Sequence, residues 1–220
     1  MIQSRHLRAF FAPAVALTLS ASADAALIRY SDFIAGNSTQ TFEFDEGTVT
    51  VRAVGGSFAF KNSNGVTGLG VSGGSEAAEI DGSQHLIFEF SSPVAIDRLR
   101  IGHLFASGLR ADVVDEAARF RINDDDSYTL TAETAGSASW SGDQSVDNVA
   151  DGCWEIDSGD IFGETSEILM RSANPGSRNM GDFSFQTLEF EFLEGAPVPA
   201  PAATLLLALV MLGSRRRRGV

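Results

Sequence analysis

The chain has 220 residues, of which 44% are hydrophobic and 20% charged, and this composition is typical of one folding domain of ordinary size. Its formal net charge of −13 excludes the phosphate backbone of a nucleic acid as the expected partner. A single cysteine excludes both a disulfide framework and a zinc site built from cysteines.

The first segment, residues 1–25, has the pattern of a signal peptide. Basic residues precede a short apolar run over residues 9–19, and Ala23 and Ala25 then supply the small-x-small pattern that signal peptidase reads. As a helix, the apolar run would rise only about 17 Å, whereas a bilayer core measures about 30 Å. We therefore expect cleavage before Ala26; a buried N-terminal helix is the alternative.

The last segment, residues 195–220, has three successive parts. A proline-rich stretch over residues 196–201 precedes an apolar run over residues 202–212. Four arginines follow this run, namely Arg215, Arg216, Arg217 and Arg218. An apolar segment that ends in arginines is expected to stop in the inner membrane with its charges in the cytoplasm. Because the apolar run is short, we expect a transient stop that is later processed; a weak permanent anchor is the alternative.

These three parts, taken in order, resemble a PEP-CTERM sorting signal. The usual Pro-Glu-Pro core is replaced here by a Val-Pro-x-Pro-Ala variant, formed by Val198, Pro199, Ala200, Pro201 and Ala202. The resemblance implies recognition by an exosortase, a membrane cysteine transpeptidase of Gram-negative bacteria that make exopolysaccharide. It also implies passage through the inner membrane to the cell surface or the extracellular space.

Without these two ends, the body over residues 26–194 is strongly acidic. It keeps ten of the 16 basic residues and 28 of the 29 acidic residues, a net charge of about −18. Such a surface is expected to remain soluble by mutual repulsion and to attract cations rather than anionic polymers.

The body shows the alternation that is typical of half-buried β-strands. Phenylalanines recur two residues apart in five places, namely Phe42 and Phe44, Phe58 and Phe60, Phe88 and Phe90, Phe183 and Phe185, and Phe190 and Phe192. Residues two apart share one face of a strand but not of a helix. The body therefore reads as antiparallel strands with one apolar face and one polar face.

Turn-forming residues separate these runs. Residues 45–47 and 123–126 have hairpin composition, the glycine-rich residues 65–74 read as a loop, and residues 111–119 could form one or two helical turns. This pattern predicts an all-β fold, specifically an antiparallel β-sandwich of jelly-roll type, and a closed barrel is the structural alternative.

Two glycine motifs overlap in that predicted loop, and both are interpreted as accidental. Residues 68–73 match G-x-G-x-x-G, but no helix is expected after them to receive a pyrophosphate. Residues 70–74 match G-x-S-x-G, which requires an α/β sheet and a later histidine. Only His85 and His103 follow, and both lie on expected strands.

Clustered carboxylates suggest a structural Ca²⁺ site. Glu76, Glu79 and Asp81 lie in one connection, and a second Glu-Ile-Asp tripeptide occurs over residues 155–157. Oxygen ligands in an irregular loop suit Ca²⁺, although the spacing is not that of an EF-hand. Solvated loop charge in an acidic protein is the alternative.

The sequence selects no catalytic group. Asp151 and Glu155 beside Cys153 are expected to raise the pKa of its thiol, so Cys153 is interpreted as a buried or adventitious thiol rather than a nucleophile. With so many acidic residues, no particular carboxylate pair can be assigned to glycoside hydrolysis.

We therefore expect an exported, non-enzymatic β-sandwich at the cell surface or in the extracellular matrix, with signal peptidase and an exosortase as processing partners. A carbohydrate-binding module that contacts exopolysaccharide is the alternative, by analogy with other jelly rolls. A polysaccharide-cleaving enzyme is the third hypothesis.

Overall fold

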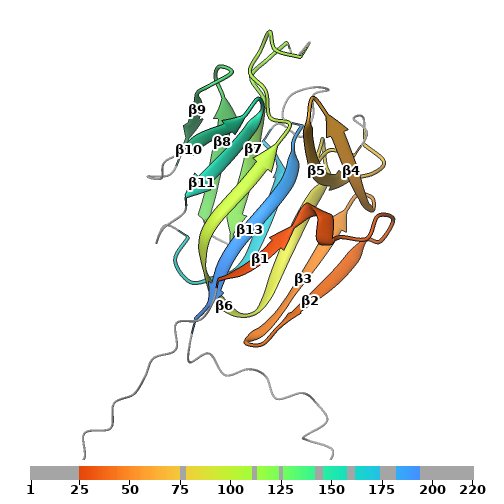
Figure 1. Ribbon diagram of the computed structural model, residues 1–220, viewed down its shortest axis with the longest axis vertical. Coiled ribbons are helices and arrows are strands. Elements are labelled where there is room, and N and C mark those ends of the chain that lie inside the picture. The colour runs from red at the N-terminus through yellow and green to blue at the C-terminus, as the bar shows by residue number, and fades with distance from the viewer. Residues whose placement is uncertain are drawn as a thin grey trace, which may run out of the picture.

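The computed structural model describes residues 25–74, 78–110, 113–123, 126–141, 146–157, 162–173 and 182–193. In these residues the chain forms 13 antiparallel strands and one short 3₁₀ turn, η1 (Tyr30–Asp32) (Figure 1). The strands form one continuous 13-stranded hydrogen-bonded sheet that folds into two layers, called here the first and second sheets, which share one long strand, β6 (His85–Gly102).

The first sheet uses residues 85–90 of β6. Its other strands are β2 (Thr39–Phe44), β3 (Gly47–Val54), β7 (Ala117–Ile122), β8 (Asp126–Ala132), β9 (Ala138–Trp140) and β12 (Thr165–Ser172). They lie in the order β2-β3-β6-β12-β7-β8-β9.

The second sheet uses residues 94–102 of β6. Its other strands are β1 (Ala26–Arg29), β4 (Phe58–Ser63), β5 (Val66–Val71), β10 (Val146–Ala150), β11 (Cys153–Asp157) and β13 (Ser184–Phe192). They lie in the order β10-β11-β6-β13, and β13 then pairs with both β1 and β5, which is followed by β4.

The transfer of β6 between the sheets occurs at an interruption of its pairing with β12. Thr165 pairs with Val94 and Glu167 pairs with Glu89, so four residues of β6 face one residue of β12. Pro93 lies in this interruption, where its missing N–H removes no ladder hydrogen bond. Such an irregularity bends a strand, and here it directs the two halves of β6 into different layers.

Phenylalanines fill the space between the two layers. Phe88 of the first sheet contacts Phe185 of the second with ring centroids 5.1 Å apart, and the centroids of Phe90 and Phe190 are 5.3 Å apart. Burial of each large side chain contributes about 1.5–3 kcal/mol, so these inward-facing positions hold the layers together. The predicted antiparallel β-sandwich is confirmed, whereas the jelly-roll connectivity stays a prediction.

The predicted turns are confirmed, but two local predictions are wrong. Phe44 pairs with Gly47 and Ile122 with Asp126, as hairpins at residues 45–47 and 123–126 require. The predicted glycine-rich loop instead contains strand β5. The predicted helical turns are replaced by β7 from Ala117 onward, and the described residues before it are not helical.

No helix among the described residues is long and apolar enough to cross a membrane. Ala23, the Val-Pro-x-Pro-Ala motif and the four terminal arginines lie outside the described residues.

Candidate functional site

The outer face of the second sheet carries a row of charged and polar side chains. Leu99 and Ile101 of β6 point into the core and are fully buried, so Arg98 and Arg100 point outward. The register places Glu155 of β11 opposite Arg100. The spacing of outward residues on three neighbouring strands thus brings basic and acidic groups together.

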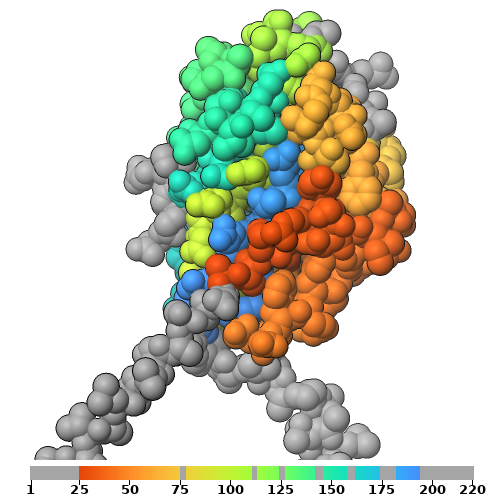
Figure 2. Space-filling model, viewed as in Figure 1, coloured from red at the N-terminus to blue at the C-terminus, as the bar shows by residue number. Residues whose placement is uncertain are grey.

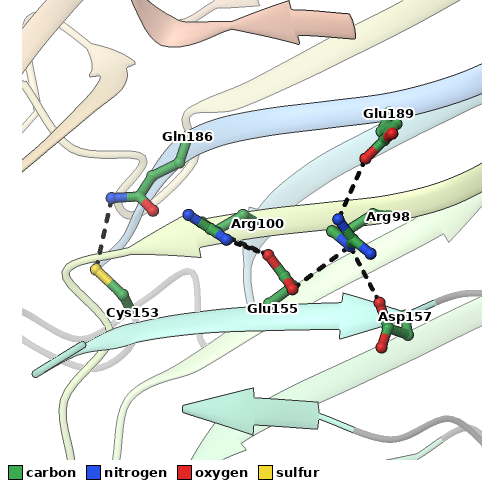
Figure 3. Close-up of polar contacts among 7 residues, drawn as sticks. All are labelled: Arg98, Arg100, Cys153, Glu155, Asp157, Gln186 and Glu189. Atoms are coloured by element: carbon green, nitrogen blue, oxygen red, sulfur yellow. Dashed lines mark hydrogen bonds and ion pairs between the residues drawn. The ribbon is translucent and has the colours of Figure 1, made fainter. Parts of the chain in front are cut away.

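Ion pairs connect these strands (Figure 3). The Arg98 Nε lies 3.2 Å from an Asp157 oxygen and 3.4 Å from a Glu155 oxygen, and its Nη1 lies 3.4 Å from Glu189. The Arg100 Nε donates a 2.9 Å hydrogen bond to Glu155. The hydrogen bond with Asp157, together with the charge of Glu155, raises the pKa of Arg98. This set joins β11, β6 and β13 by their side chains.

A hollow of about 310 Å³ lies at one end of this row. Its walls come from η1, the β4–β5 hairpin, β10, β11, β6 and β13, through residues Tyr30, Gly65, Val66, Thr67, Arg100, Val149, Ala150, Cys153, Gln186 and Thr187. In Figure 2, β13 lies between the β10–β11 pair on one side and the β4–β5 hairpin on the other. We call this hollow the outer pocket.

Two β-bulges shape the outer pocket. Phe185 pairs with Ile101 and Thr187 with Arg100, which leaves Gln186 as an extra residue of β13. In the same way, the pairing of β10 with β11 skips Val149, whose side chain is 41% exposed. Bulges re-aim side chains at sheet surfaces, and these two place an amide and a small apolar group at the pocket wall.

Cys153 lies beneath the pocket wall and is buried. Gln186 Nε2 lies 3.5 Å from its Sγ (Figure 3). The same Nε2 donates a 3.2 Å hydrogen bond to the carbonyl oxygen of Thr67. Burial raises the pKa of the Cys153 thiol. The thiol therefore stays protonated at neutral pH, but the main cause is burial; of the two carboxylates named from the sequence, Asp151 contributes least and Glu155 is not among the causes.

A serine and a histidine meet elsewhere in the sandwich. His103 Nδ1 and Ser184 Oγ are 2.7 Å apart, but the two residues are 1% and 0% exposed. Burial lowers the pKa of His103 to about 4, with a contribution from Lys61. A substrate cannot reach this pair, so its geometry supports a structural role.

The glycines of the two overlapping motifs permit close packing of β5. A Cβ atom on Gly68 would collide with the Ser184 side chain, and one on Gly70 would collide with the backbone of Ala78. Gly68 and Gly70 are strand residues with no helix beginning after them in the described part of the chain. Their role is therefore close approach of neighbouring segments.

The predicted Ca²⁺ ligands are only partly described. Glu79 and Asp81 are both buried, and the Nζ of Lys61 lies 3.4 Å from a Glu79 oxygen. Glu76 lies outside the described residues. Among the described residues, no three side chains of metal-ligating type lie close enough together to hold an ion. The Ca²⁺ site stays a prediction.

No family model, no curated protein and no solved structure matches this chain. The arrangement itself offers a phenol ring, an amide and two threonines around a hollow of modest size. Such a combination suits the binding of a small polar group through hydrogen bonds and ring contact. Sequence patterns did not single out Gln186, because a bulge has no signal in the alternation, and no local pattern shows that Tyr30 and Thr187 lie beside it.

Proposed function

We propose that the protein is an exported, non-enzymatic β-sandwich that an exosortase processes and delivers to the cell surface or the extracellular matrix. The observation that carries this proposal is the pair of terminal segments, residues 1–25 and 195–220, with the patterns of export and sorting signals. Signal peptidase and the exosortase are the processing partners, and insertion in the inner membrane is transient.

The ends of the fold support these boundaries. Strand β1 begins at Ala26, the proposed first residue of the mature protein, and Ala26 pairs with Phe190 of β13. Strand β13 ends at Phe192, before the proline-rich stretch. Removal of both segments would therefore leave every described strand and its pairing intact.

The sorting proposal is tested by deletion of residues 215–218 in the host. We expect the deleted chain to escape processing and to change its distribution between membranes and culture fluid. A control with four lysines in place of the arginines keeps the positive charge and is expected to retain the membrane stop. Identical mass and location of the deleted and natural chains would refute the proposal.

A carbohydrate-binding module is the second candidate, and the outer pocket favours it. Aromatic rings beside amides and hydroxyls suit sugar rings, and Tyr30 and Gln186 supply these groups. Binding to a glycan array, measured with and without Ca²⁺, tests this candidate. The substitution Tyr30→Ala should abolish any signal, whereas Ile34→Ala, at a 60% exposed residue outside the pocket, should not. Absence of binding to any glycan, both with and without Ca²⁺, would rule out the carbohydrate-binding function.

A further inference from the structure

The outer face of the first sheet contains three basic side chains in one row. Arg171 of β12 pairs with Arg119 of β7 on one side and with His85 of β6 on the other. The neighbours of Arg171 and Arg119 along each strand, including Met170 and Phe120, are buried. The row therefore faces solvent, and its members are on adjacent strands about 5 Å apart.

Arg119 and Arg171 have no ion pair with any residue in the described part of the chain. Nε of Arg119 is buried and has no hydrogen-bond partner there. By contrast, the two arginines in the next row of the same face pair with carboxylates one row further along, Arg52 with Glu89 at 2.7 Å and Arg121 with Glu167 at 3.3 Å. Arg98 and Arg100 of the second sheet are paired in the same way (Figure 3).

The lack of a described ion pair at Arg119 and Arg171 is unfavourable for the isolated protein. Like charges directly opposite each other on neighbouring strands repel, and a buried donor without an acceptor is destabilising. The body has 28 acidic residues for ten basic ones, so carboxylates are abundant. Two arginines on adjacent strands that pair with no carboxylate in the described residues indicate that an external anion neutralises their guanidinium groups.

We propose that Arg119, Arg171 and His85 bind the acidic groups, carboxylate or sulfate, of an acidic polysaccharide. The row continues with Thr129 of β8 beyond Arg119 and Val54 of β3 beyond His85, so the strip spans roughly 19 Å across five strands. A polymer chain can lie along this strip.

The charge of the surrounding surface favours an acidic polysaccharide over a nucleic acid as the ligand of the strip. Glu89 and Glu167 lie on the same face two rows from the strip, beyond Arg52 and Arg121, and the whole body is acidic. A duplex nucleic acid, with its dense charge on a wide surface, would meet these carboxylates, whereas a single polysaccharide chain with sparser charge would not. The choice of a polysaccharide as the ligand rests on the proposed delivery to the extracellular matrix. The existence of the anion site itself does not depend on that proposal.

The test is binding of the purified full chain to four probes: polygalacturonate, heparin, uncharged dextran and double-stranded DNA. We expect binding to polygalacturonate or heparin that weakens as salt is added, because salt screens exposed charges. Arg119→Gln and Arg171→Gln should each weaken this binding about tenfold, the value of one charge-assisted hydrogen bond. Arg98→Gln, at a paired arginine of the other sheet, is the matched control and should bind as the natural chain does.

Thermal unfolding separates a binding role from a structural one. If the arginines serve a ligand, Arg119→Gln and Arg171→Gln should keep or raise the Tm, because each variant removes like-charge repulsion. Absence of binding to both acidic polysaccharides, or equal loss in the Arg98→Gln control, would overturn the proposal. Binding of DNA as tight as that of the polysaccharides would overturn the choice of polymer. Dextran binding as tight as that of the acidic polysaccharides would overturn the role given to the acidic groups.

Discussion

His103 is a buried base whose neutral form is favoured by the fold. Its φ of 57° lies in the left-handed region, and its ring is held against Ser184. Because burial lowers the pKa of His103 to about 4, the folded state binds a proton less readily than the unfolded chain, in which the pKa is ordinary. The stabilising contribution of His103 is therefore complete above about pH 6.5 and is lost as the pH falls toward 4.

We predict that His103→Asn removes this part of the pH dependence. Asparagine tolerates the left-handed backbone and can hydrogen-bond to Ser184 but does not titrate in this range. The natural chain should lose about 3 kcal/mol of unfolding free energy between pH 6.5 and 4 from this group. Urea denaturation at several pH values measures the loss. The same pH dependence in both proteins would contradict the assignment.

Glu155 is the acceptor shared by the two arginines on the second sheet. Its side chain is only 13% exposed, whereas that of Asp157 is 47% exposed. We predict that Glu155→Gln lowers the unfolding free energy by about 1–3 kcal/mol, because both arginines lose a charged acceptor. Asp157→Asn should change it by less than about 1 kcal/mol, since exposed pairs are screened. Equal effects in chemical denaturation would show that burial does not govern this cluster.

Strand β5 is the element whose sequence most resembles a loop. Its glycines allow two other segments to approach closely, as the collision of a Gly70 Cβ with the backbone of Ala78 shows. Backbone cannot move aside as a flexible side chain can, so a methyl group at this position must displace a strand.

We predict that Gly70→Ala lowers the unfolding free energy by about 1–3 kcal/mol. Gly136→Ala is the matched control, because no atom lies within 4 Å of a Cβ at that exposed turn. Thermal unfolding of the two variants provides the comparison. A Gly70→Ala variant as stable as the control would show that β5 does not pack as described.

At the level of elements, alternation predicted strands wherever apolar side chains dominate one face. The Phe88 and Phe90 pair identified β6, and Phe190 and Phe192 identified β13. Alternation could not predict β5, because Gly68 and Gly70 have no side chains to alternate. It also could not show that β6 runs continuously through both sheets, since Pro93 reads as a break in the sequence and acts as a bend in the fold.

At the level of the whole molecule, the candidate sites depend on which strands are neighbours. Arg119 and Arg171 are more than 50 residues apart in sequence, and only the register of β7 with β12 brings them together. Tyr30, Arg100 and Gln186 meet in the outer pocket for the same reason. Local patterns contain no pairing information, so the sequence predicts the layers but not what gathers on their outer faces.

The two outer faces suit an extracellular protein with separate polar surfaces. One face bears the outer pocket and the paired Arg98 and Arg100, and the other bears the strip of Arg119 and Arg171, which pair with no carboxylate among the described residues. This division allows loss of one binding activity without loss of the other, as the Tyr30→Ala and Arg119→Gln variants would reveal. Both proposed activities require that the body first reaches the extracellular space.

Intact-mass analysis of the protein from culture fluid and from membranes of its host tests most directly whether the chain is exported and processed. The account predicts a chain that begins at Ala26 and lacks the four terminal arginines, with the mass of any attached group added. Recovery of the uncut 220-residue chain from the cytoplasm would contradict it.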